Sequence, residues 1–580
     1  MKCDTLRAGI QMPSTIDALL ASLETAKSRF GRGAAAEIKP LLDQLSHCRF
    51  RDAKSLIRFH EALLFLRAFP QATSLVAPIE KLLNTFHKRV EHLRELGVDM
   101  SAFDDFDTSG IAGTTMQDSL PFEAARWLAR RIPNAVEIAW DDYVTDHEAE
   151  RAMGSTWPRL IPLLGEDANV EANIPWRSWL DAARGREREP EWLILRLEQL
   201  VVTSRERAEL YDSLRLPLRW HLKNLKFSRT RNWTRPRQFH CHKEPLIVRS
   251  QVLLARELAQ PAPRLANLVH REGESVMHTI REVMAVRYRE LYGTTLGDPG
   301  SVVRTTLDRG VEMYFWNLPS GRRLPLRAYV AGFTLKNGVP INYIEAIGLF
   351  EWIEVGFNTF YTYRQGETAW IYAQALRCLC AFTGATTISV YPYQIGQQND
   401  EAIDSGAFWF YRKLGFRSGS RELEQLARTE EEKIAANPQY RTPKKILRRL
   451  AEAHVFYELP GEEKHGWDDF STRNLGLRVN RRMAREFGGD MGRICAASIK
   501  EVSRALGVNL SRWNPAARQA FENWSLVLAL IPDLRRWSPR EKRDAAKIIR
   551  AQAGPDEMRY LRLTQQHLRL REEVRRLGSK

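Results

Sequence analysis

Residues 405–416 read SGAFWFYRKLGF, a stretch that places one tyrosine, Tyr411, among aromatic neighbours and closes on a Gly-Phe pair. Its spacing predicts a short helix that ends at the glycine, followed by a strand that begins near Phe416. The preceding residues 386–396, TTISVYPYQIG, are rich in β-branched and aromatic side chains and predict another strand. These residues are therefore predicted to hold a tyrosine on a short helix that lies between two strands.

The segments upstream of this stretch predict an antiparallel meander. Asn337-Gly338 predicts a hairpin turn, because both residues can adopt a positive φ. Residues 363–382 then switch to helical spacing directly after a strand. The strands of the meander are predicted from four segments that are rich in β-branched and aromatic residues: 310–318, 323–338, 339–350 and 352–363.

The rest of the chain predicts helices on both sides of this core, since apolar residues recur there at three- and four-residue spacing. From about Thr429 the chain is predicted to be helical to its end. The expected fold class is α+β, a mixed sheet core with helical flanks. A chain of 580 residues is too long for one core. We expect a mainly helical region over 1–265, which can hold two subdomains, a mixed core over 266–425, and a basic helical region over 426–580.

The composition is that of a globular protein, with 44% hydrophobic and 27% charged residues. No stretch reaches 18 uncharged apolar residues, so we expect no membrane partner. The first twenty residues lack the apolar core and cleavage site of a signal peptide, and we expect a cytoplasmic location. The six cysteines are scattered and form no CxxC pair, so we expect no disulfide framework and no metal.

The net charge of +16 is unevenly distributed. Residues 481–580 hold 22 Lys and Arg against 11 Asp and Glu, and the stretch from Arg215 to Arg249 holds ten against Glu244 alone. Aromatic residues lie between these cations. Nucleic acid is one partner that such segments suit, because cations neutralise phosphates and aromatic rings stack on bases. A solvated cationic surface is the other interpretation, and both stay open.

The core, over about residues 274–419, resembles the GNAT superfamily of acyl-CoA-dependent N-acyltransferases. The late motif of that family runs approximately Asn-x-x-Ala-x-x-Phe/Leu-Tyr-x-Lys-Leu-Gly-Phe. This chain departs from it only at the first position, where Asp404 replaces Asn. The matching residues are Ala407, Phe410, Tyr411, Lys413, Leu414, Gly415 and Phe416. The resemblance implies that Tyr411 protonates the departing CoA thiolate, whereas the alternative is that it only packs against the sheet.

The resemblance also implies a strand splayed from its neighbour and a pyrophosphate-binding turn of the form Arg/Gln-x-x-Gly-x-Gly/Ala. Here Arg364 precedes Gly366 by two residues, where the motif has an interval of three. Ala369 follows Gly366 by three residues, where the motif has an interval of two. Glu367 and Thr368 equally suit a helix cap. Acetyl-CoA or another acyl-CoA is the implied co-substrate. The residues implied to bind it are Val355, Gly356, Phe357, Arg364, Gln365, Gly366, Glu367, Thr368, Ala369, Asp404 and Ala407.

A general base for the acceptor amine is expected on the predicted strands, where Glu345, Glu351 and Glu354 lie. A carboxylate within the apolar run GLFEWIEVGF is expected to be desolvated, which raises its pKa towards a useful value. Glu354 is the first candidate and Glu351 the second, because Glu354 lies nearer the expected splay. An ion-paired carboxylate is the alternative. A loop beyond the next strand offers either substrate contacts or only polar surface: Tyr391, Tyr393, Gln394 and Asn399.

These features favour a multidomain transferase that moves an acyl group such as acetyl from CoA to an amine. The alternative is a catalytically degenerate GNAT-fold protein that binds nucleic acid or a protein partner through its basic helical regions. An enzyme whose acceptor amine is carried on a nucleic acid would join the two. Nothing in the sequence selects the acceptor.

Overall fold

The computed structural model describes residues 15–31, 33–143, 147–161, 176–223, 225–287 and 292–579. The contacts divide the chain into two units. The first unit holds Met1–Arg235, His240–Pro245 and His278–Thr295, and the second holds Pro236–Phe239, Leu246–Met277 and Leu296–Lys580. The three regions expected from the sequence stay a prediction. No helix within the described ranges has the length and apolar character that a membrane span requires.

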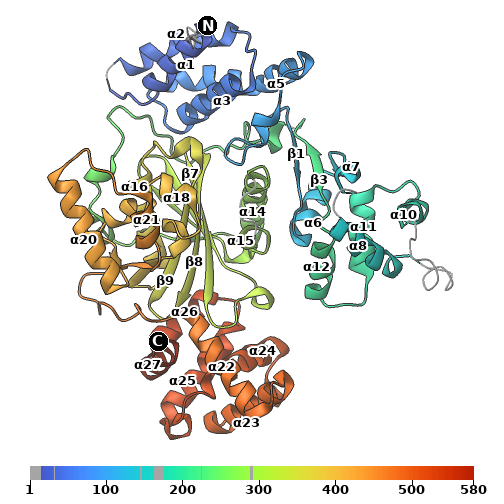
Figure 1. Ribbon diagram of the computed structural model, residues 1–580, viewed down its shortest axis with the longest axis vertical. Coiled ribbons are helices and arrows are strands. Elements are labelled where there is room, and N and C mark those ends of the chain that lie inside the picture. The colour runs from blue at the N-terminus through green and yellow to red at the C-terminus, as the bar shows by residue number, and fades with distance from the viewer. Residues whose placement is uncertain are drawn as a thin grey trace, which may run out of the picture. The chain divides into compact units, whose positions relative to one another are not determined.

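The first unit is mainly helical (Figure 1). Asp52 caps α3 by accepting a hydrogen bond from the backbone N–H of Ser55, and almost every side chain of α3 is buried. That burial makes α3 a core helix of the unit. The helices of the unit are α1 (Thr15–Ala26), α2 (Ala34–His47), α3 (Ala53–Ala68), α4 (Val76–Asn84), α5 (Phe86–Glu95), α6 (Phe122–Arg131), α7 (Trp140–Tyr143), α8 (His147–Thr156), α10 (Trp176–Arg184), α11 (Glu189–Gln199), α12 (Ser204–Ser213) and α15 (Tyr292–Thr295).

A small antiparallel sheet in the first unit departs from the helical prediction. Its strands are β1 (Thr115–Asp118), β2 (Val136–Ile138) and β3 (Leu218–His221), and β3 lies in the middle. Strands of three or four residues are too short to show an alternating pattern. Trp220, on β3, is fully buried. Part of the basic stretch from Arg215 to Arg249 is therefore interior structure.

A buried polar cluster supports the same conclusion for Arg229. Its guanidinium pairs with Glu61, and its side chain is only 2% exposed. Next to this pair, His60 contacts Glu61 through Nδ1 at 3.1 Å and the Thr230 hydroxyl through Nε2 at 2.9 Å. Arg67 donates a hydrogen bond to the Thr230 carbonyl at 2.9 Å. A guanidinium held in this way is an interior group and not a surface cation.

The second unit is built on a nine-stranded mixed sheet (Figure 1). Asn337 and Gly338 have φ values of 49° and 78°, which confirms the hairpin turn between β7 and β8. The strand order is β11-β12-β10-β9-β8-β7-β6-β5-β4. The strands are β4 (Ala266–Asn267), β5 (Val303–Leu307), β6 (Val311–Trp316), β7 (Ala328–Lys336), β8 (Val339–Leu349), β9 (Trp352–Thr359), β10 (Thr387–Val390), β11 (Arg417–Ser418) and β12 (Val455–Glu458).

The strand β12 corrects the prediction that the chain is helical from Thr429 onward. It inserts between β10 and β11 and is antiparallel to both, with Val455 opposite Val390 and Phe456 opposite Arg417. The final strand predicted near Phe416 is present as β11, but only two residues long. Four residues inside a long helical region carry too weak a period to be recognised from sequence.

The other regular elements of the second unit are mainly helices. Asn514 and Ser538 cap α24 and α25, each directly before a proline at the first helical position. The helix α14 (His270–Ala285) has residues in both units. The others are α13 (Leu254–Leu258), α16 (Thr368–Thr383), α17 (Pro392–Ile395), α18 (Asp400–Asp404), α19 (Ala407–Arg412), α20 (Arg421–Ala436), α21 (Lys444–Leu450), α22 (Thr472–Phe487), α23 (Met491–Leu506), α24 (Pro515–Leu528), α25 (Pro539–Gln552), α26 (Glu557–Gln565) and α27 (Leu568–Gly578).

Candidate active site

The two parallel strands β9 and β10 separate partway along β9. They pair over only three positions, the last of which joins Glu354 to Ser389. On its other side β9 stays paired with β8 as far as Thr359. In the described part of the sheet, the β10-side edge beyond Glu354 has no strand partner. An unpaired edge of this kind presents backbone N–H and C=O groups to an extended ligand. The predicted ligand-binding residues Val355, Gly356 and Phe357 all lie on this segment.

Tyr411 lies in an aromatic cluster that reaches the same segment. Its ring centroid is 5.6 Å from that of Tyr372 on α16 and 5.7 Å from that of Phe416. The ring of Tyr372 in turn meets that of Phe357 at 4.8 Å. Gly406 at the start of α19 has a φ of 68°, a value that glycine adopts without strain. The sequence around Tyr411 therefore places it one ring away from the side chain of Phe357.

Burial governs the chemistry of Tyr411. The residue is 5% exposed, and this burial raises the pKa of its phenol well above the ordinary value of 10. The phenol therefore carries its proton at neutral pH, and the raised pKa makes it a weaker proton donor than a free phenol. The neighbouring phenol of Tyr372 is also fully buried, and burial raises its pKa as well. Both rings stay neutral, which suits an apolar cluster.

Glu354 is held by residues from two other parts of the chain. One carboxylate oxygen, Oε2, lies 2.8 Å from Nε2 of His454, which directly precedes β12. The other, Oε1, lies 3.7 Å from a guanidinium nitrogen of Arg327. The side chain of Glu354 is 16% exposed and that of His454 is 30% exposed. A carboxylate next to a partly accessible imidazole forms a pair that can accept and pass on a proton.

Two of the predicted substrate contacts lie near this end of the site, Tyr391 beside His454 and Gln394 beside Gly356. The ring of Tyr391 meets that of His454 at 5.3 Å, edge to face. A Cβ built on Gly356 would lie 3.7 Å from the amide nitrogen of Gln394, so this amide lies close to the Gly356 backbone. The side chains of Tyr391 and Tyr393 are exposed, at 44% and 50%. Asn399 instead has a structural role, because its side chain caps α18 by accepting from Ala402. Its predicted substrate contact stays a prediction.

Glu351 lies in the turn between β8 and β9 and not within a strand, which corrects that detail of the prediction. Its carboxylate lies 2.6 Å from a guanidinium nitrogen of Arg571 on α27 and accepts a hydrogen bond at 2.8 Å from the indole of Trp467. The pairing raises the pKa of Arg571 above its ordinary value. This arrangement is the ion-paired alternative considered for the strand glutamates. Glu354 is also paired, with His454 and Arg327, and its role as the base stays a prediction.

The turn before α16 has the expected order of strand, glycine turn and helix. The Gly366 N–H donates to the Tyr363 carbonyl at 2.9 Å, and the Thr368 hydroxyl donates to the Arg364 carbonyl at 3.2 Å. Glu367 occupies the N-cap position without capping the helix. The first backbone N–H groups of α16 are thus left without a side-chain cap, and such groups bind anions. Gln365 is exposed and Ala369 is buried in the first turn of α16.

The Glu367 carboxylate points inward and is completely buried. It pairs with Arg309 and, at 3.4 Å, with the ammonium group of Lys336, and it accepts from the Ile247 N–H at 3.1 Å. Burial lowers the pKa of Lys336 to about 8, against the raising effect of Glu367. These contacts hold the turn in place. Because the Glu367 carboxylate is buried and paired with two cations, only the backbone of this residue is available to the predicted phosphate contact.

The side chain of Arg364, which is predicted to contact a phosphate, already has other partners in the structure. Its guanidinium pairs with Glu401 on α18 and lies 5.5 Å from the ring centroid of Tyr361. Its side chain is 38% exposed, so this pairing is a weak surface contact that a phosphate can displace. Asp404 pairs with Lys444 in the same way, both being exposed, and Ala407 begins α19.

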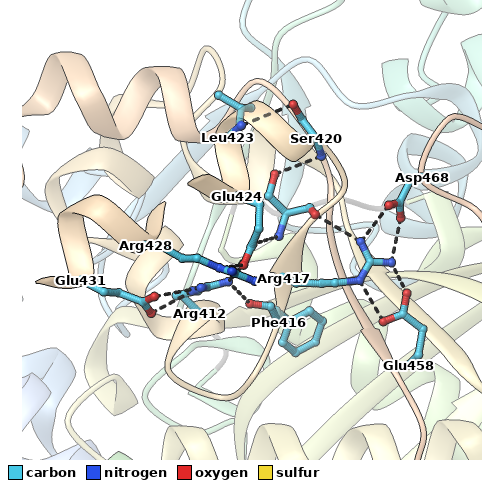
Figure 2. A network of polar contacts seen from close by, with 11 residues as sticks. Arg412, Phe416, Arg417, Ser420, Leu423, Glu424, Arg428, Glu431, Glu458 and Asp468 are labelled. Atoms are coloured by element: carbon cyan, nitrogen blue, oxygen red, sulfur yellow. Dashed lines mark hydrogen bonds and ion pairs between the residues drawn. The ribbon is translucent and has the colours of Figure 1, made fainter. Parts of the chain in front are cut away.

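An ion-pair network fixes the end of the Tyr411 motif (Figure 2). Arg412 reaches Glu424 and Glu431 on α20, each at 2.8 Å. Arg417 pairs with Glu458 on β12 and with Asp468 at 2.8 Å. Both arginine side chains are at least four-fifths buried. The network joins α19, β11, α20 and β12, and so positions Tyr411 from both sides of the motif.

Sequence reasoning missed His454, Arg327 and Tyr372. His454 starts the run HVFYE inside a region predicted to be helical, and the β-branched and aromatic residues of that run are the signal that could have found it. Within the described ranges, no group of three or more metal-ligating side chains comes together.

No family model, curated protein or solved structure matches this chain.

Proposed function

We propose that this chain is an acyl-CoA-dependent N-acyltransferase that uses the open edge of β9. The observation that carries the proposal is the separation of β9 from β10 directly after Glu354, with the Tyr411 cluster beside the freed segment. Neighbouring positions of a strand face opposite sides, so Glu354 and Phe357 lie on opposite faces of β9. The open edge of β9 borders both of these faces.

In this proposal the pantetheine arm of the acyl-CoA lies along Val355 to Phe357 and pairs with the backbone like an added strand. Its pyrophosphate lies at the uncapped N-terminus of α16, next to Gly366. Arg364 contributes a charge to the phosphates when it leaves Glu401. The reacting thioester then lies near Glu354 on one face and near Tyr411 on the other.

The proposed reaction divides the proton transfers between these two residues. Glu354, with His454 as its partner, takes a proton from the acceptor amine as the amine nitrogen forms a bond to the acyl carbon. The bond from that carbon to sulfur breaks, and Tyr411 gives its proton to the leaving thiolate. The products are an amide and free CoA, and the acceptor amine enters beside Tyr391 and Gln394.

Titration calorimetry with acetyl-CoA and longer acyl-CoAs, followed by a screen of amines for release of free thiol, tests the proposal. Saturable binding together with amine-dependent thiol release supports it. Binding of no acyl-CoA overturns it.

A second function, in which a degenerate core binds nucleic acid or a protein partner through the basic helical regions, is favoured by the pairing of Arg364 with Glu401. Arg229 is buried in the first unit, so exposed cations must supply the charge. This function predicts salt-sensitive binding of an oligonucleotide and no thiol release.

A further inference from the structure

A cavity of about 560 Å³ lies among the C-terminal helices, apart from every residue assigned to the acyl-CoA. It is bordered by the end of α23 at Leu506 to Val508, by one face of α25, and by the turn into α26. Its volume falls in the range of pockets that hold small organic ligands and is larger than one phosphate group requires.

The wall of the cavity is strongly cationic. Its charged side chains are four cations, Arg543, Lys547, Arg550 and Arg559, and one acid, Asp556. Three of the cations recur on α25 at intervals of four and three residues, which places them on one helix face. Like charges at this spacing destabilise a helix, so an anion between them would relieve the repulsion.

These cations lack the acidic partners that other arginines of the same region have. Arg482 pairs with Glu486 and Glu501, and Arg569 pairs with Asp533. Among the residues that the structure describes, none of the four cavity cations has an ion pair, and three of them also have no cation–π contact: Arg543, Lys547 and Arg559.

The two remaining charged groups of the wall are already engaged. Arg550 lies over the ring of Trp513, with its guanidinium carbon 4.4 Å from the centroid. Asp556 caps α26 by accepting from the backbone N–H of Arg559 at 3.1 Å, and it also pairs with Arg562 at 3.6 Å. The acid is thus used by the helix cap and by an arginine outside the cavity. The wall therefore has an excess of about three positive charges.

The start of one helix and the end of another border the cavity, and their dipoles contribute partial charges of opposite sign. The N-terminus of α26 contributes partial positive charge and the C-terminus of α23 at Gly507 contributes partial negative charge. Each amounts to about half an elementary charge, so the side chains determine the sign. Three of the four cations are arginines, whose planar fork matches the oxygens of phosphate.

We propose that this cavity binds the phosphate groups of a nucleoside polyphosphate. An excess of about three positive charges suits a ligand with two or three phosphates, and the volume leaves space for a nucleoside. Nucleic acid carries the same phosphate chemistry, but its diester groups have one charge each and are spaced along a strand. The gathering of four cations around one open cavity favours the compact polyphosphate.

Titration calorimetry of the full chain tests this proposal with three probes, namely inorganic pyrophosphate, ADP and a single-stranded oligonucleotide. We expect pyrophosphate and ADP to bind and the double variant Arg543→Glu, Lys547→Glu to weaken both at least tenfold. Arg540→Glu is the matched control, because Arg540 lies on the same helix, is 88% exposed and does not line the cavity. It should change the affinity less than twofold.

The charge-reversed side chains are exposed, so the double variant is expected to fold, and its thermal melt is compared with that of the control. The neutral variant Arg559→Gln provides a second measurement and should weaken ADP binding about tenfold. The proposal is overturned if neither small probe binds, if the variants bind as tightly as the unmodified chain, or if only the oligonucleotide binds. Pyrophosphate and ADP share their chemistry with the CoA pyrophosphate, so only binding that the cavity variants weaken counts in favour of this proposal, whereas binding that they leave unchanged is assigned to the turn before α16.

Discussion

The Nε2 atom of His454 lies 2.8 Å from the carboxylate of Glu354, across 100 positions of sequence. The contact joins the last β10-paired residue of β9 to the start of β12. It therefore depends on the insertion of β12 between β10 and β11, and it brings an ionisable pair to the point where the sheet opens.

The first prediction separates Glu354 from Glu351. Glu354→Gln should lower kcat by about 10²- to 10⁴-fold, because a general base contributes that much, and it should lower the thermal midpoint by no more than Glu351→Gln does, because both carboxylates are paired and equally buried. Glu351→Gln is the matched control, since it removes one partner of the buried Arg571 contact. It should lower the thermal midpoint and keep kcat. Thiol release with the best amine and thermal unfolding measure the two effects, and the opposite pattern would reverse the assignment.

His454 is predicted to be a positioning residue. His454→Phe keeps a ring against Tyr391 but removes the nitrogen that contacts Glu354. We expect kcat to fall about tenfold and the KM for acyl-CoA to stay constant. His454→Gln, which can still hydrogen-bond, should recover part of the rate. A loss of folding with an unchanged kcat per folded molecule would mean that the contact is only structural.

The third prediction concerns the phenol of Tyr411. Tyr411→Phe keeps the ring in its aromatic cluster, so the thermal midpoint should change by only a few degrees, while kcat should fall about 10²-fold. Because burial raises the pKa of this phenol above 10, its ionisation should not limit activity below pH 10. A variant with full thiol-release activity would show that Tyr411 only packs.

The fourth prediction tests the ion-pair network of Figure 2. Arg412→Ala should lower the free energy of unfolding by about 1–3 kcal/mol, because it leaves Glu424 and Glu431 without a mostly buried partner. Arg428→Ala is the control, since Arg428 pairs with the same Glu424 but is 63% exposed. Urea unfolding compares them. Equal effects would mean that the network does not stabilise α19.

The fifth prediction is a pH dependence in the first unit. Burial lowers the pKa of His60 from 6.5 to about 4, so the folded state keeps this imidazole neutral while the unfolded chain protonates it below 6.5. The stability due to this difference is present above pH 6.5 and is lost as the pH falls towards 4, by up to about 3 kcal/mol. Urea unfolding of wild type and His60→Gln at pH 7 and 4.5 measures it, and an unchanged difference would contradict it.

Long segments of the core were predictable from sequence because their periods are strong. The meander from β6 to β9, the Asn337-Gly338 turn and α16 all follow from β-branched content, turn chemistry and helical spacing. The position of Tyr411 near β9 depends on Tyr372, which sequence alone does not relate to it. The short strands β1–β3 and β12 have too few residues to show a period.

The remaining part of the site could not be predicted because it depends on contacts between distant residues. His454 and Arg327 lie in segments without a motif, and only the strand order brings them to Glu354. The pairing of Arg364 with Glu401 and the burial of Arg229 are likewise tertiary outcomes. The charge distribution along the sequence suggests that Arg229 is a surface cation, whereas its side chain lies in the interior.

Titration calorimetry of acetyl-CoA against the full chain and against Gly366→Trp tests the central claim most directly. Gly366 does not have a positive φ, so its backbone conformation is open to other residues, and the variant places a large side chain directly before the N-terminus of α16. The account predicts saturable binding to the unmodified chain and at least a tenfold loss in a variant with an unchanged thermal midpoint. No binding to the unmodified chain, or equal binding to both, would contradict it.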